Sequence, residues 1–293
     1  MQAIVFYLVL PFIYFISILP FWILYGISDI MYIFLYYILR YRRDVVIKNL
    51  QNSFPDKSPE ELKKISKKFY SYLCDLTLES LKKLTMTRKQ TLKHCKFHDT
   101  SLFKKLHAEN RSIILLMGHY GNWEWAGSTF TLETDYQLFV IYKPLSNIYW
   151  ENLMVKTRTM FGTKLIKVNN TLRDMINNKS TLSATAFIAD QTPFPENAFW
   201  TKFLNQDTPV FTGAEKISKK LNYPIVFINI IRTKRGYYEI FAELLEQEPK
   251  NTIENEISER FINRLEKEII KKPEIWLWSH RRWKHKRKDV PIS

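Results

Sequence analysis

The chain has 293 residues, of which 46% are hydrophobic and 15% aromatic, so it can bury a large core. Its 44 basic residues outnumber its 29 acidic ones and leave a formal net charge of +15. Two cysteines exclude a disulfide framework, and the basic balance favours an anionic partner such as nucleic acid, anionic lipid or an acidic carrier protein.

The N-terminal 39 residues have the composition of a hydrophobic membrane anchor. Asp29 is the only charged residue before Arg40, and Ala3–Leu19 is long enough to enter or cross a bilayer. No basic segment precedes this stretch, which argues against a signal peptide. We therefore expect an anchor over residues 1–39, as a span, a hairpin or an interfacial segment, and a cytosolic domain over residues 40–293. A buried hairpin in a soluble core is the alternative.

Basic residues follow the anchor at once, at Arg40, Arg42, Arg43 and Lys48. By the positive-inside tendency they keep the rest of the chain in the cytoplasm. Ser58, Pro59 and Glu61 then have the spacing of a helix N-terminus with a capping box. Apolar residues at helical spacing predict that this helix continues to Leu76.

The stretch RSIILLMGHYGNWEW, residues 111–125, combines a buried strand with a polar turn. Ile113–Met117 is a continuous apolar run, which is typical of a strand covered on both faces. Gly118 and Gly121 allow a sharp turn and a close approach by a ligand. Asn122 is a candidate N-cap, which would place Glu124 in the first turn of a following helix.

His119 and Glu124 in this stretch suggest general-base catalysis. Histidine exchanges a proton near neutral pH and needs a partner that fixes its tautomer. We predict that Glu124 bends back to the imidazole Nδ1 and leaves the other nitrogen free to accept a proton from a hydroxyl group. The spacing alone can arise by chance in a chain with six histidines and 29 acidic residues.

The rest of the chain alternates between strand-like and helix-like segments. We predict strands at Tyr136–Tyr142, Lys164–Val168, Leu182–Ala189, Ile225–Ile231 and Tyr237–Leu244, and an extended piece at Ala198–Phe203. We predict helices at Asn147–Phe161, Thr171–Asn177, Gly213–Leu221 and Ile253–Lys271. This alternation indicates an α/β fold: a mixed, mostly parallel sheet covered by helices on both faces, with the N-terminal hydrophobic helical segment as its membrane anchor.

Polar residues at predicted element ends are candidates for the same site. Lys143 ends a strand that we place beside the strand leading to His119, and Arg158 lies in the next helix. Both suit phosphate oxygens, and the alternative is a surface charge at a helix end. Asp190 and Gln191 end an apolar strand and should lie at the same sheet edge as His119. They would support the site or contact substrate, or else anchor a loop.

The C-terminal stretch PEIWLWSHRRWKHKRK, Pro273–Lys288, mixes tryptophans with basic residues. Trp276, Trp278 and Trp283 would form an aromatic belt at a lipid headgroup layer. Basic residues among aromatics also bind single-stranded nucleic acid, but the hydrophobic N-terminus makes a membrane the simpler partner. His280 has no carboxylate at a comparable spacing, which favours a structural or headgroup-binding role.

The chain resembles the lipid A secondary (late) acyltransferases in the order of its segments. These are the anchor, the segment RRDVVIKNLQNSFP, the block GHYGNWEW, the basic positions, the Asp-Gln pair and the terminal Trp/Arg block. This family is a branch of the His-x4-Asp/Glu glycerolipid acyltransferases. The resemblance implies transfer of a fatty acyl chain from acyl carrier protein to a hydroxyl of a phosphorylated membrane glycolipid. It also implies a bacterial inner membrane protein with its catalytic domain in the cytoplasm. We assign His119 and Glu124 as catalytic and, as substrate-binding, Gly121, Asn122, Lys143, Arg158, Asp190, Gln191, His280 and Arg281.

Other readings stay open. The acceptor can instead be a lysophospholipid or an aminolipid, or the chain can be a non-catalytic, basic, membrane-bound binder of anionic lipid or nucleic acid. A serine hydrolase would need Gly-x-Ser-x-Gly, which the chain lacks. The chain also has no phosphate-binding Gly-x4-Gly-Lys-Ser/Thr loop and no His-Glu-x2-His. We therefore expect no cofactor, no metal and no nucleic-acid partner.

Overall fold

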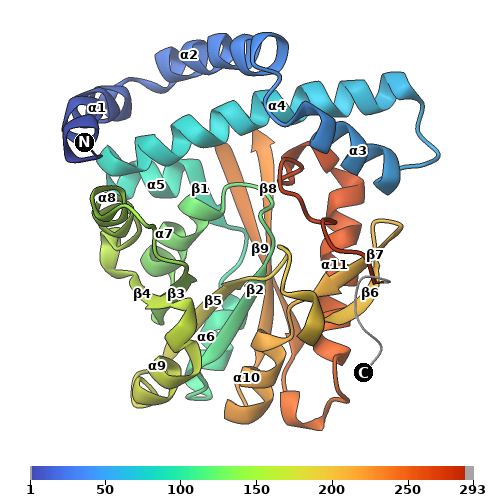
Figure 1. Cartoon of the computed structure of the whole chain (residues 1–293). Coiled ribbons are helices and arrows are strands. Elements are labelled where there is room, and N and C mark those ends of the chain that lie inside the picture. The colour runs from blue at the N-terminus through green and yellow to red at the C-terminus, as the bar shows by residue number, and fades with distance from the viewer. Residues whose placement is uncertain (1, 288–293) are drawn as a thin grey trace.

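The computed structural model describes residues 2–287, so Lys288 of the basic C-terminal stretch lies outside it. Its main feature is a seven-stranded sheet with the order β1-β9-β8-β2-β5-β3-β4 (Figure 1). The strands are β1 (Cys95–Phe97), β2 (Ile113–Met117), β3 (Gln137–Tyr142), β4 (Lys164–Lys167), β5 (Ser183–Ile188), β8 (Ile225–Lys234) and β9 (Tyr237–Glu246). All neighbours pair in parallel except β8 and β9. The predicted mostly parallel sheet is confirmed.

Helices cover both faces of this sheet, as predicted. They are α1 (Gln2–Ile18), α2 (Phe21–Ile33), α3 (Arg43–Ser53), α4 (Pro59–Lys82), α5 (Arg88–His94), α6 (Ser101–Ala108), α7 (Trp123–Glu133), α8 (Ile148–Arg158), α9 (Thr171–Asn177), α10 (Gly213–Leu221) and α11 (Glu256–Lys271). On one face, α6 and α7 pack against alternate residues of β2, including Leu115. On the other face, α10 and α11 join a second core that includes Leu116.

Strand β2 lies in the middle of the sheet because its sequence can be buried on both sides. All five of its residues are buried, and it pairs with β5 on one side and β8 on the other. Since side chains alternate along a strand, its residues divide between the two cores. The strand therefore delivers residue 118 and those after it to the carboxyl edge of the sheet.

Helix α4 crosses this carboxyl edge (Figure 1). It begins as predicted, because the Ser58 side chain accepts from the Glu61 backbone N–H and the Glu61 carboxylate accepts from the Ser58 N–H. It also continues beyond Leu76, to Lys82. Tyr72 on this helix donates a 2.6 Å hydrogen bond to the Gly121 carbonyl, so α4 directly supports the turn after β2.

The predicted elements after the central block are all present, with boundaries that differ by a few residues. The long last helix begins at Glu256 rather than Ile253, because Asn255 adopts a left-handed backbone conformation. The extended piece 198–203 is strand β6 (Phe199–Phe203), which forms a separate antiparallel hairpin with β7 (Gln206–Val210). The sequence patterns did not indicate β7, β1, α5 or α6.

The N-terminal segment forms two apolar helices that lie across α4 (Figure 1). Within residues 2–287 one helix, Phe21–Ile38, which joins α2 to a π-helical turn, is long and apolar enough to cross a membrane. It is a candidate membrane anchor. Helix α1, which contains most of the predicted Ala3–Leu19 stretch, is a shorter apolar helix of 17 residues. Large apolar side chains on both helices face outward, among them Phe12 at 68% and Trp22 at 76% exposed.

Candidate functional site

The turn after β2 places His119 at the carboxyl edge of the sheet. The surroundings of this turn require a glycine at position 121 and leave little room beyond one at position 118. A Cβ atom on Gly118 would lie 2.8 Å from the Leu265 side chain, and one on Gly121 would lie 2.3 Å from the Ile230 carbonyl oxygen. Gly121 also has a φ of +66°, which disfavours other residues. The predicted tight turn is therefore present.

Asp190, at the end of β5, binds His119 at two points. Its Oδ2 accepts the His119 backbone N–H at 2.8 Å, and its Oδ1 lies 2.6 Å from the imidazole Nδ1. Trp276 Nε1 donates a third hydrogen bond at 2.8 Å. Burial alone would raise the pKa of Asp190, but these three donors, His119 above all, hold it below its usual value. An ionised Asp190 accepts a hydrogen bond from Nδ1–H, which keeps the proton on Nδ1 and thereby fixes the tautomer.

This pairing corrects the expectation that Glu124 would bind Nδ1. The carboxylate on Nδ1 comes from Asp190, 71 residues further along the chain. With Nδ1 occupied, Nε2 is the nitrogen that can accept a proton. Within residues 2–287 its one hydrogen-bond partner is the side-chain amide of Gln191, at 3.3 Å. The edge of the Trp123 ring packs against the imidazole, with 4.9 Å between centroids.

Glu124 lies in the first turn of α7, as predicted, but its carboxylate is held by two cations. Arg158 donates to it through Nε, at 3.2 Å to each oxygen, and through Nη2. Lys83 Nζ lies 3.9 Å from Oε2 and donates to the Glu124 carbonyl at 2.7 Å. Burial would raise the pKa of Glu124, but Arg158 and then Lys83 bring it below the usual value. The local cluster has two cations and one anion.

The same contacts revise what was expected of Arg158. Its guanidinium grips a carboxylate of the protein in the two-pronged manner predicted for a substrate phosphate. Burial lowers the pKa of the neighbouring Lys83 to about 8, so a large fraction of this amine is charged at neutral pH. Arg158 Nη1 makes no hydrogen bond within the described residues.

Asn122 is the N-cap of α7, as predicted, and belongs to the scaffold beneath the site. Its Oδ1 accepts the Trp125 backbone N–H at 3.0 Å, and its Nδ2 donates to Glu79 at 2.8 Å. Glu79 also accepts from Tyr25 on α2 at 2.9 Å and from Tyr238 on β9 at 2.7 Å. Burial raises the pKa of this carboxyl group. Asn122 is completely buried, with both polar side-chain atoms already paired.

Lys143 does not lie where it was predicted. Its strand, β3, pairs with β5 and β4, so β5 separates it from β2. The side chain is exposed, and within the described residues it makes no hydrogen bond or ion pair. The predicted position of Lys143 is wrong because β2 and β3 are neighbours in sequence but not in the sheet, where β5 lies between them.

The predicted tryptophan belt is also wrong. Trp276, Trp278 and Trp283 are all buried, at 8% exposed or less, and they pack on one another in the core that contains Leu116. Their ring N–H groups bond inside the protein, including the bond from Trp276 to Asp190. The C-terminal stretch therefore completes the site from behind. Its apolar rings lie inward and leave basic residues such as Arg281 exposed.

Two further residues of this stretch, His280 and Arg282, lie within electrostatic reach of Asp190. His280 is partly buried, and burial lowers its pKa to about 4 although Asp190 opposes the shift. Arg282, which we did not single out from the sequence, is 1% exposed and donates to the Pro209 carbonyl at 2.7 Å. Burial lowers its pKa to about 10, again against the influence of Asp190. A buried arginine inside an aromatic segment has no sequence signal that separates it from its exposed neighbours.

A narrow apolar slot of about 40 Å³ lies between α7 and the sheet. Trp123, which contacts His119, is one of its walls. The other walls are residues of β1, β2, β3, β5, β8 and α7: Phe97, Leu115, Met117, Ala126, Gly127, Phe130, Leu138, Val140, Ala186, Ile188 and Ile228. Trp123 therefore lies between this apolar slot and the histidine at the sheet edge.

A parallel α/β sheet, an acid-paired histidine at its carboxyl edge, an apolar slot beside it and apolar N-terminal helices together fit an acyltransferase. Comparison with known proteins establishes that the chain is an acyltransferase and identifies its family. The chain belongs to the family described as bacterial lipid A biosynthesis acyltransferase, whose model matches residues 1–285.

Two curated relatives are similar over most of their length. One is named lipid A biosynthesis palmitoleoyltransferase, from Escherichia coli (strain K12), and the other lipid A biosynthesis acyltransferase, from Shigella flexneri. Each is 24% identical over 248 residues, which cover 84% of this chain and 80% of the relative.

Proposed function

We propose that this acyltransferase moves a fatty acyl chain from the thioester of acyl carrier protein to a hydroxyl group of a phosphorylated glycolipid of the lipid A type. Family membership and the names of both relatives support an acceptor of this kind. The observation that carries the proposal is the pairing of His119 Nδ1 with Asp190, which leaves Nε2 directed at Gln191 alone.

In the proposed reaction His119 is the general base. Nε2 takes the proton of the acceptor hydroxyl as the oxygen attacks the thioester carbonyl carbon, and Asp190 stabilises the imidazolium that forms. When the tetrahedral intermediate collapses, the C–S bond breaks and the imidazolium returns the proton to the departing sulfur. Gln191 would yield its contact with Nε2 to the incoming hydroxyl. Glu124 contributes by holding Arg158 beside this site.

The surroundings of His119 suit the two proposed substrates. The apolar slot beyond Trp123 would take the start of the acyl chain, and its side chains would have to move apart to admit more. The cluster of Lys83, Arg158 and Glu124 carries a net positive charge, which favours phosphorylated substrates. An overall charge of +15 favours association with an acidic carrier protein.

We further propose that residues 1–39 attach the enzyme to the bacterial inner membrane and that residues 40–293 work on the cytoplasmic side. The apolar helix Phe21–Ile38, the outward-facing side chains of α1 and α2, and the basic residues just after them support this arrangement. Nucleic acid is not a proposed partner, because the aromatic rings of the C-terminal stretch are buried and unavailable for stacking on bases.

The direct test mixes the purified full-length chain with acyl–acyl carrier protein and a lipid A precursor that has one free acyl-linked hydroxyl, and follows the product by mass spectrometry. We expect one acyl chain to be added, and no addition to the same precursor with that hydroxyl blocked. A lysophospholipid acceptor serves as a comparison. Acyl release without transfer to any lipid, or no acyl release at all, would contradict the proposal.

A further inference from the structure

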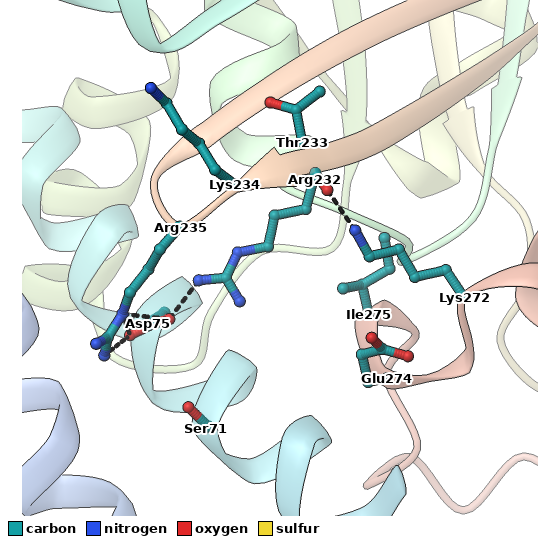
Figure 2. A pocket seen from close by; sticks show the side chains of 9 residues that line it. All are labelled: Ser71, Asp75, Arg232, Thr233, Lys234, Arg235, Lys272, Glu274 and Ile275. Carbon is teal, nitrogen blue, oxygen red and sulfur yellow. Dashed lines mark hydrogen bonds and ion pairs between the residues drawn. The ribbon is translucent and has the colours of Figure 1, made fainter.

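A second cavity, of about 350 Å³, lies beside the β8–β9 hairpin and plays no part in the reaction proposed above. Three separate segments line it (Figure 2). They are Ser71 and Asp75 of α4, the hairpin residues Arg232, Thr233, Lys234 and Arg235, and Lys272, Glu274 and Ile275 after α11. The cavity is therefore built by the tertiary fold and not by one loop.

The cavity walls carry more positive than negative charge. They contain four cations and two carboxylates. Asp75, 1% exposed, is shared by Arg232 and Arg235, and Glu274 lies 3.9 Å from Lys68 at the rim. Within residues 2–287, Lys234 and Lys272 form no ion pair. Burial lowers the pKa of Lys272, as expected for an amine whose charge is not fully compensated.

Arg232 is the residue that points most directly to a ligand. Its side chain is only 15% exposed, and Nη2 donates to Asp75. Its Nε is buried without a hydrogen-bond partner in the described part of the chain. The other terminal nitrogen, Nη1, makes no hydrogen bond there and is not fully buried. Figure 2 shows this second terminal nitrogen turned toward the middle of the cavity. Buried guanidinium N–H groups without acceptors are costly, and phosphate oxygens match their geometry.

The cavity lies next to the apolar N-terminal helices and at the same sheet edge as His119. Arg235 binds Asp29 of α2, and Ser28 of α2 donates to Asp75 at 2.6 Å. On the other side, the Ile275 carbonyl accepts the Gly121 backbone N–H at 3.1 Å. If α2 enters the membrane, the cavity lies at the level of the lipid headgroups.

We propose that this cavity binds a phosphomonoester carried by a membrane lipid. The inference rests on the membrane attachment in the proposed function and not on the acyl-transfer step. A doubly charged monoester matches the surplus of positive charge on the cavity walls, and Arg232 Nη1 supplies a donor for one of its oxygens. Lys234 contributes its charge from above the Tyr237 ring, 4.1 Å from the ring centroid, and Lys272 also donates a hydrogen bond to the Arg232 carbonyl. The monoester can belong to the glycolipid acceptor or to an ordinary phospholipid, because the recognition chemistry is shared.

The test is a calorimetric titration of the full-length chain in a neutral detergent with short-chain phosphatidic acid, which carries a monoester. Short-chain phosphatidylglycerol, a diester, and inorganic phosphate are titrated in parallel. We expect phosphatidic acid to bind at least about five-fold more tightly than the other two, because only it has both the double charge and the lipid moiety. Equal binding of all three, or no binding of phosphatidic acid, would overturn the proposal.

Variants then locate the site. The double change Lys234→Gln and Lys272→Gln should weaken phosphatidic acid binding roughly ten-fold or more, since it removes two of the four positive charges of the cavity walls. Lys104→Gln, an exposed lysine on α6 at the opposite end of the sheet, is the matched control and should bind as the unchanged chain does. Arg232→Lys, which keeps a cation for Asp75, should also weaken binding. Wild-type affinity in the folded double variant would overturn the proposal.

A competition arm separates the two sources of the monoester. If the lipid A precursor displaces phosphatidic acid and its dephosphorylated analogue does not, the cavity takes the acceptor phosphate. Failure of both to displace it, with the lysine dependence retained, assigns the cavity to a phospholipid. Acyl transfer is not measured in these titrations, so their failure would leave the proposed reaction standing.

Discussion

At the scale of single residues, His119 lies near two carboxylates and each has a different role. Asp190 takes Nδ1 and the backbone N–H, whereas Glu124 is engaged by Arg158 and Lys83. The pKa of both carboxyl groups is below the usual value, so both are ionised at neutral pH. Asp190 orients the proposed base directly. Glu124 acts on the site only through the cation it holds.

The Glu124–Arg158 pair should matter for stability as well as activity. Glu124→Gln leaves Arg158 and Lys83 facing each other without an anion, and we expect a loss of about 2–3 kcal/mol in unfolding free energy. This is less than for a fully buried pair because Arg158 stays 26% exposed. Denaturant unfolding measures it. Wild-type stability in Glu124→Gln would contradict this account.

Arg158→Lys, which keeps the charge but loses the planar guanidinium with its two-pronged hydrogen bonding, should raise KM for the phosphorylated acceptor.

His280 should make stability depend on pH in a defined window. Its pKa is about 4 in the folded chain, against about 6.5 in an unfolded one, because burial disfavours the charged ring. Between these values the unfolded chain binds more protons, so the unfolding free energy falls as pH decreases from 6.5 to 4. His280→Gln should reduce that fall by about 1–2 kcal/mol, allowing for partial exposure.

Unfolding curves of His280→Gln and the unchanged chain, measured between pH 4.5 and 6.5, provide the check. Asp190 and Glu124 have lowered pKa values in the folded chain. Their contributions to the unfolding free energy therefore persist down to about pH 4 and are lost only at lower pH. Burial also lowers the pKa of His94 and raises that of Glu79, so the difference between the two proteins, and not the slope of either one, reports on His280. Equal slopes for the two proteins would show that His280 is not buried in its neutral form.

At the scale of elements, the start of α7 is fixed by a buried polar network and not by its own sequence alone. Asn122 caps the helix and at the same time donates to Glu79 of α4. Glu79 accepts further hydrogen bonds from α2 and β9. Three elements distant in sequence thus determine where α7 begins, and with it the positions of Trp123 and Glu124.

Removing the Asn122 side chain should therefore cost more than an ordinary helix cap. Asn122→Ala loses the cap, worth about 1 kcal/mol, and leaves a buried carboxyl group with one donor fewer, for roughly 2–3 kcal/mol in total. Asn147→Ala is the matched control, because Asn147 caps α8 through Tyr149 and Trp150 only. We expect about 1 kcal/mol and full activity for the control. Equal losses in the two variants would argue against the network.

Most elements could be predicted because their signals are local. The apolar run of β2, the capping box of α4 and the period of α11 all depend on neighbouring residues. The hairpin partner β7 was missed because its residues, QDTPV, lack the alternation of a typical strand and include a proline. Strand order could not be predicted because it is not a local property: nothing in β3 indicates that β5 separates it from β2.

Several residues of the site could be predicted from the sequence, but not which of them form hydrogen bonds with one another. The sequence indicated that His119, Asp190 and Gln191 share one edge, because parallel strands end together. It could not show that Asp190 rather than Glu124 reaches Nδ1, since that depends on the register of β5 against β2. The C-terminal tryptophans were misplaced because an aromatic-basic pattern is the same whether the rings face lipid or core.

At the scale of the whole molecule, the apolar N-terminal helices are part of the fold as well as a proposed membrane anchor. Tyr25 and Ser28 of α2 donate to Glu79 and Asp75, two carboxyl groups buried on α4. Removal of the anchor would therefore expose a charged, formerly covered surface. The proposed division at residue 39 separates two functions, and the two parts share one packed interface.

Deleting residues 1–39 should release part of the protein from membranes and also lower its melting temperature. We expect residual, salt-sensitive membrane binding, because each surface Lys or Arg near an anionic leaflet contributes about 1 kcal/mol that salt screens. Flotation with vesicles at low and high salt measures it. The pair Tyr25→Phe and Ser28→Ala, which keeps the apolar helix, should lower stability without release. A truncated protein that stays bound at high salt would reveal a further hydrophobic contact.

The central claim is that His119, oriented by Asp190, is the base for acyl transfer. Its most direct test is the turnover rate of His119→Ala, Asp190→Asn and the double variant with acyl–acyl carrier protein and a lipid A precursor. We predict that each single change lowers kcat by roughly 10²–10⁴-fold and that the double variant is hardly slower, because the two residues act as a unit. Wild-type turnover in folded Asp190→Asn, or losses that multiply in the double variant, would contradict the account.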